Sequence, residues 1–209
     1  DKICKMRSRP KILLARNYDE ALVIFNKYKD FLLCVISDVA FERAGKMDKT
    51  AGVKFIRYAK SHIIDLPVIL QSSDETNAKL ARKLDVRFLN KNSETLLIDI
   101  KKYLTSYLGF GNFTFRDKEG NKIAVAKSLR DFETLLKEIP DDSFHLHASE
   151  NKFSLWLMAR GEIQLAKTLN PVNVDQFSDL KESRQFFIDT IRRYKEEKKR
   201  GKILRFDET

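Results

Sequence analysis

Three polar side chains with complementary chemistry come just after three apolar runs in the first half of the sequence. They are Asp38, Ser72 and Lys91. A carboxylate can act as the nucleophile in phosphoryl transfer, and a hydroxyl and an ammonium group can stabilise the transferred group. Each residue alone is weak evidence, because an Asp at a strand end is more often a helix cap and a Ser there is usually a turn residue. Finding all three, each after one of three successive apolar runs, is much less expected by chance than finding any one of them.

The apolar runs themselves predict strands of a parallel sheet. We expect strands at Lys11–Ala15, Phe31–Ile36, Leu66–Leu70 and Val86–Leu89. The second run is continuous rather than alternating, which is typical of a strand buried on both faces. Helices are predicted between the runs: one capped by Asn17, one after a loop over Val39–Lys49, one over Asp74–Leu84 and one over Ser93–Leu108. This alternation predicts a doubly wound α/β sheet that gathers its chemistry at the carboxyl ends of the strands.

Together the three residues resemble the receiver domain of two-component response regulators, a flavodoxin-like fold. The resemblance implies that Asp38 accepts a phosphoryl group, that Ser72 binds this group and that Lys91 pairs with it. It also implies that Phe88, three residues before Lys91, changes rotamer as part of a switch. A histidine kinase is the partner that the resemblance implies.

The resemblance further implies Mg²⁺, held by Asp38 and by an acidic pair at the end of a preceding strand. No such pair occurs before Lys11, so we expect the first strand and helix of the fold to lie upstream of Asp1 and Mg²⁺ to be held weakly or not at all here. The missing strand would leave a slot between the first two predicted strands. We expect these strands to pair directly, a second copy to donate a strand in a homo-oligomer, or a clipped first unit to stay bound.

The second half reads as a different domain. Gly109–Gly111 marks the boundary, so residues 1–109 form the receiver-like domain and residues 110–209 a mainly helical α+β accessory domain. We expect a hairpin over residues 113–125 and a helix that begins at Ser128. Further predictions are a short strand at Ser143–His147, a helix over residues 153–166, and a last helix carrying Phe186 to Tyr194 before a basic end.

His145 and His147 invite a metal hypothesis, because residues two apart on a strand share one face. Asp142 or Glu150 could add a carboxylate. A pair of histidines without a clear third ligand is common by chance, however, so a structural role is the favoured interpretation. Trp156 is most simply a core residue.

Charge and composition restrict the class of protein. The net charge is +10, with 21 Lys and Arg against 13 Asp and Glu in residues 1–109 and 19 against 17 in residues 110–209. No nucleic-acid reading motif accompanies the basic residues, so we do not expect nucleic-acid binding. No apolar run approaches the roughly 20 residues of a membrane helix, and the two cysteines make no disulfide framework. A cytoplasmic protein without a membrane partner is the prediction.

At the level of whole segments the chain resembles the front end of bacterial phosphoenolpyruvate synthase-like proteins, in the pyruvate phosphate dikinase group. The segments are Pro10-Lys-Ile-Leu-Leu-Ala-Arg16, Val35-Ile-Ser-Asp-Val39, Ile69-Leu-Gln-Ser-Ser73, Leu89-Asn-Lys-Asn-Ser93, Gly109-Phe-Gly-Asn-Phe113 and His147-Ala-Ser-Glu-Asn-Lys-Phe-Ser-Leu-Trp-Leu-Met-Ala-Arg160. The resemblance implies that catalytic domains for ATP and pyruvate follow Thr209. The chain would then be no enzyme itself but a regulatory phosphoacceptor module, or alternatively a vestigial receiver that serves as an interaction scaffold.

Overall fold

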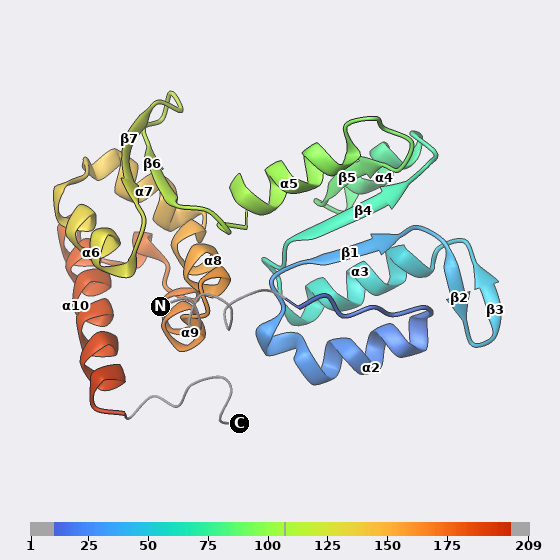
Figure 1. Cartoon of the computed structure of the whole chain (residues 1–209), viewed down its shortest axis with the longest axis horizontal. Coiled ribbons are helices and arrows are strands. Elements are labelled where there is room, and N and C mark those ends of the chain that lie inside the picture. The colour runs from blue at the N-terminus through green and yellow to red at the C-terminus, as the bar shows by residue number, and fades with distance from the viewer. Residues whose placement is uncertain (1–10, 107, 202–209) are drawn as a thin grey trace. The chain divides into compact units, whose positions relative to one another are not determined.

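The computed structural model describes residues 11–106 and 108–201 (Figure 1). The chain divides into two compact units, Asp1–Leu104 and Thr105–Thr209. Each unit has a hydrophobic core of its own, around Phe25, Ile56 and Leu70 in the first and around Phe132, Phe153 and Trp156 in the second. The architecture is α/β, with a small parallel sheet in the first unit.

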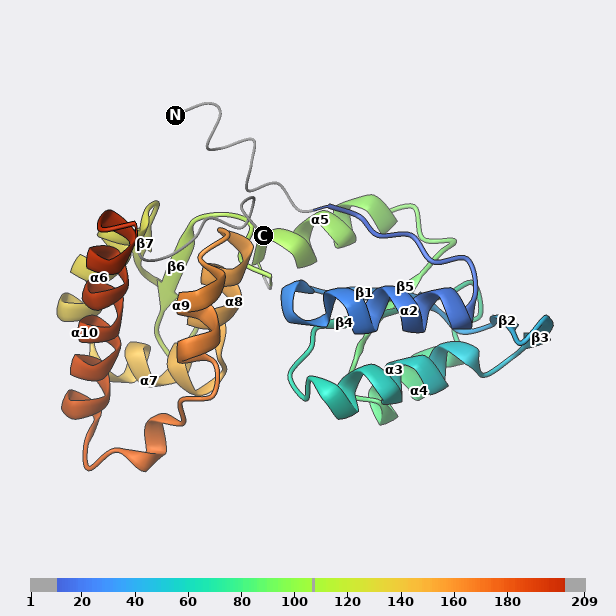
Figure 2. The same cartoon turned by 90° about the horizontal axis from the view of Figure 1, so that it is seen from below.

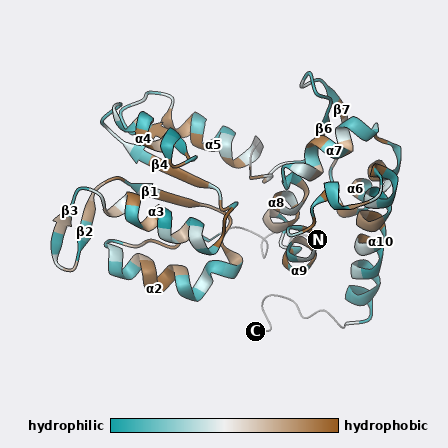
Figure 3. Ribbon diagram, turned by 180° about the vertical axis from the view of Figure 1, so that it is seen from behind, coloured by the Kyte–Doolittle hydropathy of each residue, from teal (hydrophilic) through white to brown (hydrophobic). Residues whose placement is uncertain are grey.

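The sheet of the first unit consists of β1 (Val35–Asp38), β4 (Val68–Ser72) and β5 (Arg87–Asn90), in the order β1-β4-β5. Both pairings are parallel. Figure 3 shows strands β1 and β4 coloured as largely hydrophobic. Because the strands are parallel neighbours, their carboxyl ends meet at one edge of the sheet.

Four helices accompany this sheet in the described part of the first unit. They are α2 (Tyr18–Tyr28), α3 (Ala51–His62), α4 (Asn77–Lys83) and α5 (Leu96–Ser106). In Figure 2, α3 and α4 lie on one side of the sheet and α5 on the other. Asn17 caps α2 as predicted, because its side chain accepts a hydrogen bond of 2.8 Å from the backbone N–H of Glu20.

The first two predicted strands are wrong as stated. Lys11–Ala15 forms no strand, and the side chains of Ile12 and Leu14 are 94% and 71% exposed, so the direct pairing of this segment with the next strand is wrong too. Phe31 belongs to a short 3-10 helix, Lys29–Phe31, and the strand begins only at Val35. Its second residue, Ile36, is 48% exposed, so this strand is not buried on both faces. Side chains of a strand point to the two faces of the sheet, and burial on both faces needs cover on each of them.

The predicted loop Val39–Lys49 is in fact a small antiparallel hairpin, β2 (Phe41–Arg43) and β3 (Lys46–Asp48). The turn forms at Ala44 and Gly45, which both have positive φ. Contacts with α2 stabilise the hairpin: the ring of Tyr18 stacks on Phe41, and a carboxylate oxygen of Asp19 accepts a hydrogen bond from the N–H of Ala44. The sequence gives little sign of this hairpin, because its strands are short and polar.

The second unit begins with the predicted hairpin, β6 (Phe113–Arg116) and β7 (Lys122–Ala126), which turns through Gly120 at φ +88°. Helices follow: α6 (Leu129–Glu138), α7 (Asp141–Ser149), α8 (Lys152–Ala159), α9 (Ile163–Leu169), a 3-10 turn (Val174–Gln176) and α10 (Leu180–Lys199). Ser128 caps α6 as predicted, since its hydroxyl accepts a hydrogen bond from the N–H of Asp131. The buried aromatic side chains of the hairpin and the helices share one core.

Two predictions for the second unit are wrong. The predicted strand Ser143–His147 lies within helix α7, so His145 and His147 point in different directions rather than sharing a face. His145 is exposed and pairs with Asp175, whereas His147 is buried. The predicted continuous helix 153–166 breaks between α8 and α9, where Gly161 has a φ of +78° that ends α8.

None of the helices in the described ranges combines the length and the apolar composition that a membrane crossing demands.

Candidate functional site

The carboxyl edge of the parallel sheet brings Asp38 and Lys91 into direct contact. Asp38 is the last residue of β1, and Lys91 follows the last residue of β5. The Nζ atom of Lys91 lies 2.6 Å from Oδ1 of Asp38, although β4 separates the two strands in the sheet. The backbone N–H of Lys91 donates a hydrogen bond of 2.9 Å to the carbonyl oxygen of Ser72, which fixes the start of its loop against β4.

This ion pair is open to solvent. The side chains of Asp38 and Lys91 are 45% and 39% exposed. An exposed pair of this kind contributes about 0–1 kcal/mol to stability, because water and salt screen it. The pair is therefore accessible to a small anionic ligand, and little free energy is needed to separate the two groups.

Ser72, the last residue of β4, has a hydroxyl oxygen that accepts two hydrogen bonds. The donors are the backbone N–H of Asp74 at 3.1 Å and the side-chain Nδ2 group of Asn77 at 3.0 Å. A hydroxyl has two lone pairs and one proton, so both lone pairs are used. No group in the described part of the chain accepts the proton of this hydroxyl. The arrangement suits Ser72 to donate a hydrogen bond to a ligand oxygen.

Gly52 brings helix α3 against the end of β1. Its backbone N–H donates a hydrogen bond of 3.0 Å to the carbonyl oxygen of Val39. A Cβ atom at Gly52 would lie 1.9 Å from the carbonyl oxygen of Asp38, which is far inside contact distance. The backbone of Asp38 can hold its position only because residue 52 has no side chain.

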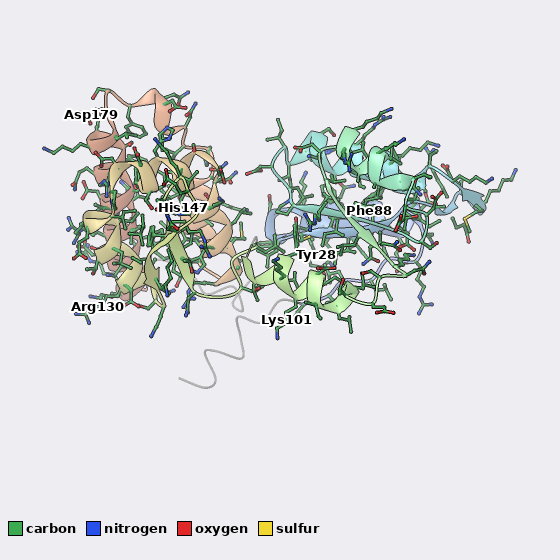
Figure 4. The ribbon with its side chains drawn as sticks, turned by 90° about the horizontal axis from the view of Figure 1, so that it is seen from above. Tyr28, Phe88, Lys101, Arg130, His147 and Asp179 are labelled. Carbon is green, nitrogen blue, oxygen red and sulfur yellow. The ribbon has the colours of Figure 1, made fainter. Side chains whose placement is uncertain are left out.

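Phe88, the residue that the resemblance implies as a switch, lies in the middle of the sheet's third strand (Figure 4). It is paired in register with Leu70 of β4. Its ring is half-buried and packs against the core that α3 and α4 form with the sheet. A half-buried ring at this position has one side in the core and one side near solvent.

The resemblance implies Mg²⁺, and this expectation stays a prediction. In residues 11–106 and 108–201, no group of three or more His, Cys, Asp or Glu side chains could hold a metal ion. Two carboxylates of the turn that follows β4 have partners of their own: Asp74 accepts hydrogen bonds from Thr76, which lower its pKa, and Glu75 accepts one from Asn90. We derive no step of the chemistry through a metal.

Sequence reasoning missed Gly52 and Asn77. A glycine inside a helical pattern costs about 1 kcal/mol relative to alanine, so Gly52 could have indicated a close backbone approach. Asn77 stands five residues after Ser72 in a polar stretch, and only the turn at Asp74–Thr76 brings it back to the strand end. Its contact therefore has no signature in the sequence pattern.

The basic end of α10 is a second surface that the charge pattern singled out. Here Arg192 and Lys195 both donate to the carboxylate of Glu133, whose side chain is only 12% exposed. Desolvation would raise the pKa of Glu133, but these two hydrogen bonds, together with the positive charges of Lys195 and Lys137, outweigh it and lower the pKa. Lys198 pairs in the same way with Glu162. Arg192, Lys195 and Lys198 thus form ion pairs within the second unit, so their charges are partly neutralised and less available to bind a polyanion.

The chain was compared with known proteins at the level of families, sequences and structures. No family model, curated protein or solved structure matches it. The resemblance to receiver domains and to phosphoenolpyruvate synthase-like proteins therefore stays a prediction from the residues and motifs of this chain.

Proposed function

We propose that the first unit is a receiver-like phosphoacceptor module that regulates an attached phosphoenolpyruvate synthase-like phosphotransferase. The observation that carries the proposal is the contact of 2.6 Å between Lys91 and Asp38. Ser72 ends β4, the strand between them, and both lone pairs of its hydroxyl already accept hydrogen bonds. A nucleophilic carboxylate, a cation and a hydrogen-bond donor then lie at one solvent-open sheet edge. The module itself is no enzyme, and its partners are a histidine kinase and the catalytic domains of the same polypeptide.

Each residue has a role in this proposal. The Asp38 carboxylate attacks the phosphorus atom of a phosphoryl donor, and Lys91 moves from the carboxylate to the new phosphoryl oxygens. Ser72 donates a hydrogen bond to one of these oxygens. The solvent-exposed ion pair supports this change of partner. Lys91 would leave one anion, the Asp38 carboxylate, for another, the phosphoryl group bonded to that carboxylate.

The test is phosphorylation of the purified chain by acetyl phosphate in a buffer containing Mg²⁺, followed by intact-mass analysis and peptide mapping. We expect slow addition of a single phosphoryl group at Asp38, and none in Asp38→Asn. Asp85→Asn is the matched control, because Asp85 is fully exposed and its positive φ suits asparagine. Labelling that survives Asp38→Asn would contradict the proposal.

One observation favours a second function, an interaction scaffold without phosphorylation. The Lys91 ammonium group already neutralises Asp38, and the described residues hold no metal cluster that would compete with it. If the unit is a scaffold, Asp38 is not labelled at any concentration of the phosphoryl donor. The unit then binds the downstream catalytic domains, and Asp38→Asn leaves this affinity unchanged. A phosphoacceptor module predicts labelling and a change in that binding when Asp38 is modified.

A further inference from the structure

Asn77 is the first residue of helix α4 and lies beside the end of strand β4. Its side chain is half-buried, and its Nδ2 group donates a hydrogen bond of 3.0 Å to Oγ of Ser72. An asparagine amide has both donors and an acceptor, and here its donor end is directed at the hydroxyl oxygen.

The turn between β4 and α4 holds this amide in place. Oδ1 of Asp74 accepts hydrogen bonds from the backbone N–H of Thr76 at 2.9 Å and from its hydroxyl at 2.7 Å. The backbone N–H of Asn77 donates to the carbonyl oxygen of Asp74 at 3.2 Å. Because Asp74 also donates its own N–H to Ser72, one turn supplies both donors that reach the Ser72 hydroxyl.

The consequence concerns the direction of the Ser72 proton. With both lone pairs of Oγ occupied by donors, the O–H bond must point away from Asp74 and Asn77. A hydroxyl held in this way needs no reorientation to donate to an anion, and preorganised donors of this kind are the ones that stabilise developing charge most strongly.

We infer that Asn77 is a positioning residue for phosphoryl transfer to Asp38, acting through the hydroxyl of Ser72. This inference rests on the proposed function. In the step, an Oδ atom of Asp38 forms a bond to the phosphorus atom of an acyl phosphate, and the bond from phosphorus to the acyl oxygen breaks. The electron pair of that bond leaves with the carboxylate product, so no proton is transferred. Ser72 donates its hydrogen bond to an oxygen of the phosphoryl group in the transition state of the transfer.

The sharpest test replaces the donor by an acceptor. Asn77→Asp keeps the size of the side chain but places a carboxylate oxygen against Ser72 Oγ, so the hydroxyl proton turns toward residue 77. With acetyl phosphate as the probe, we expect Asn77→Asp to lower the maximal labelling rate of Asp38 by about a hundredfold, the lower end of the range found when one such donor is removed. The half-saturating donor concentration should change little.

A double-mutant cycle separates positioning from a general structural effect. Ser72→Ala should slow labelling by a similar factor, and Asn77→Asp added to Ser72→Ala should slow it no further, because the hydroxyl that Asn77 orients is gone. Asn92→Asp is the matched control: it adds the same charge next to Lys91, and Asn92 donates to Asn90 through its backbone N–H, which the substitution keeps. This variant should be labelled within about twofold of the parent rate.

The outcomes are distinguishable. A parent chain that is never labelled at Asp38 overturns the proposed function and this inference with it. A labelled parent with Asn77→Asp at the parent rate overturns the role of Asn77 alone. Additive losses in the double variant also overturn it, because they would place the effect of Asn77 outside Ser72. Urea unfolding of each variant, monitored by far-ultraviolet circular dichroism, checks that the compared proteins are folded.

Discussion

Acidification should destabilise the second unit through His147. This side chain is 3% exposed and lies among the rings of Phe113, Phe115 and Phe153. Its Nε2 atom accepts a hydrogen bond of 2.8 Å from the backbone N–H of Arg116 in the hairpin, so Nδ1 carries the proton of the neutral ring. Figure 4 labels the residue in the interior of its unit. Protonation of Nε2 would place a charge in an apolar site and break the hydrogen bond to β6.

The size of the effect follows from the pKa. Burial lowers the pKa of His147 from 6.5 to about 4, and the positive charges of Lys152 and Arg116 act in the same direction, while Glu150 opposes them. Between these two values the unfolded chain binds more protons than the folded one, so stability is complete above the unfolded pKa and falls as the pH drops toward the folded pKa. From about pH 7 to about pH 4.5 the expected loss is roughly 2–3 kcal/mol.

Urea unfolding at a series of pH values measures this loss. The fluorescence of Trp156 reports on the second unit alone, because it is the only tryptophan in the sequence and is buried in that core. His147→Gln keeps an oxygen that can accept from the Arg116 N–H but does not titrate, so it should lose roughly 2–3 kcal/mol less stability over this range than the parent chain. His145→Gln, at an exposed histidine on the same helix, should keep the full dependence. Equal pH dependence in the parent chain and in His147→Gln would refute the reasoning.

Three further predictions concern single contacts. Gly52→Ala should destabilise the first unit by about 3 kcal/mol or more in urea unfolding and shift the amide resonance of Asp38, whereas Gly45→Ala, with open space at its Cβ position, should cost only about 1 kcal/mol. Arg184→Met should cost about 2–4 kcal/mol by Trp fluorescence, because the buried guanidinium donates to the last carbonyls of α6, while Arg193→Met on the same helix should be neutral. Glu133→Gln should raise the affinity of the chain for heparin at low salt, because it frees three cations; unchanged retention on a heparin column would contradict this.

The parts of the fold that depend on local signals could be predicted from the sequence. Asn17 and Ser128 each cap the helix that follows them, and the turn at Gly120 joins two strands at the predicted place. These features involve residues within four positions of one another. Helix caps and tight turns are decided by such neighbours, so the pattern contains the information.

The predictions that failed depended on partners far away in the chain. The apolar run Lys11–Ala15 has the composition of a strand, but a strand needs a neighbour, and no described strand lies beside it. The alternation of polar and apolar residues at Ser143–His147 suggested a strand. The segment is helical instead, and Pro140 with the acidic first turn that follows it is typical of a helix start. For the candidate site, strand ends predicted Asp38, Ser72 and Lys91, but the approach of Gly52 and Asn77 depends on how α3 and α4 pack.

The parallel pairing of β1 with β4 has a consequence for the order in which the first unit can fold. The hairpin β2–β3 and helix α3 stand between these strands in the chain, so β1 has no partner in the described sheet until all of them have been synthesised. At translation rates of about 5–20 residues per second, β1 leaves the ribosome seconds before β4 does. Hairpin β6–β7, whose strands are adjacent in sequence, closes in about 1–10 μs once both are free. A growing chain therefore passes through a stage in which Val35 and Ile36 are available to chaperones.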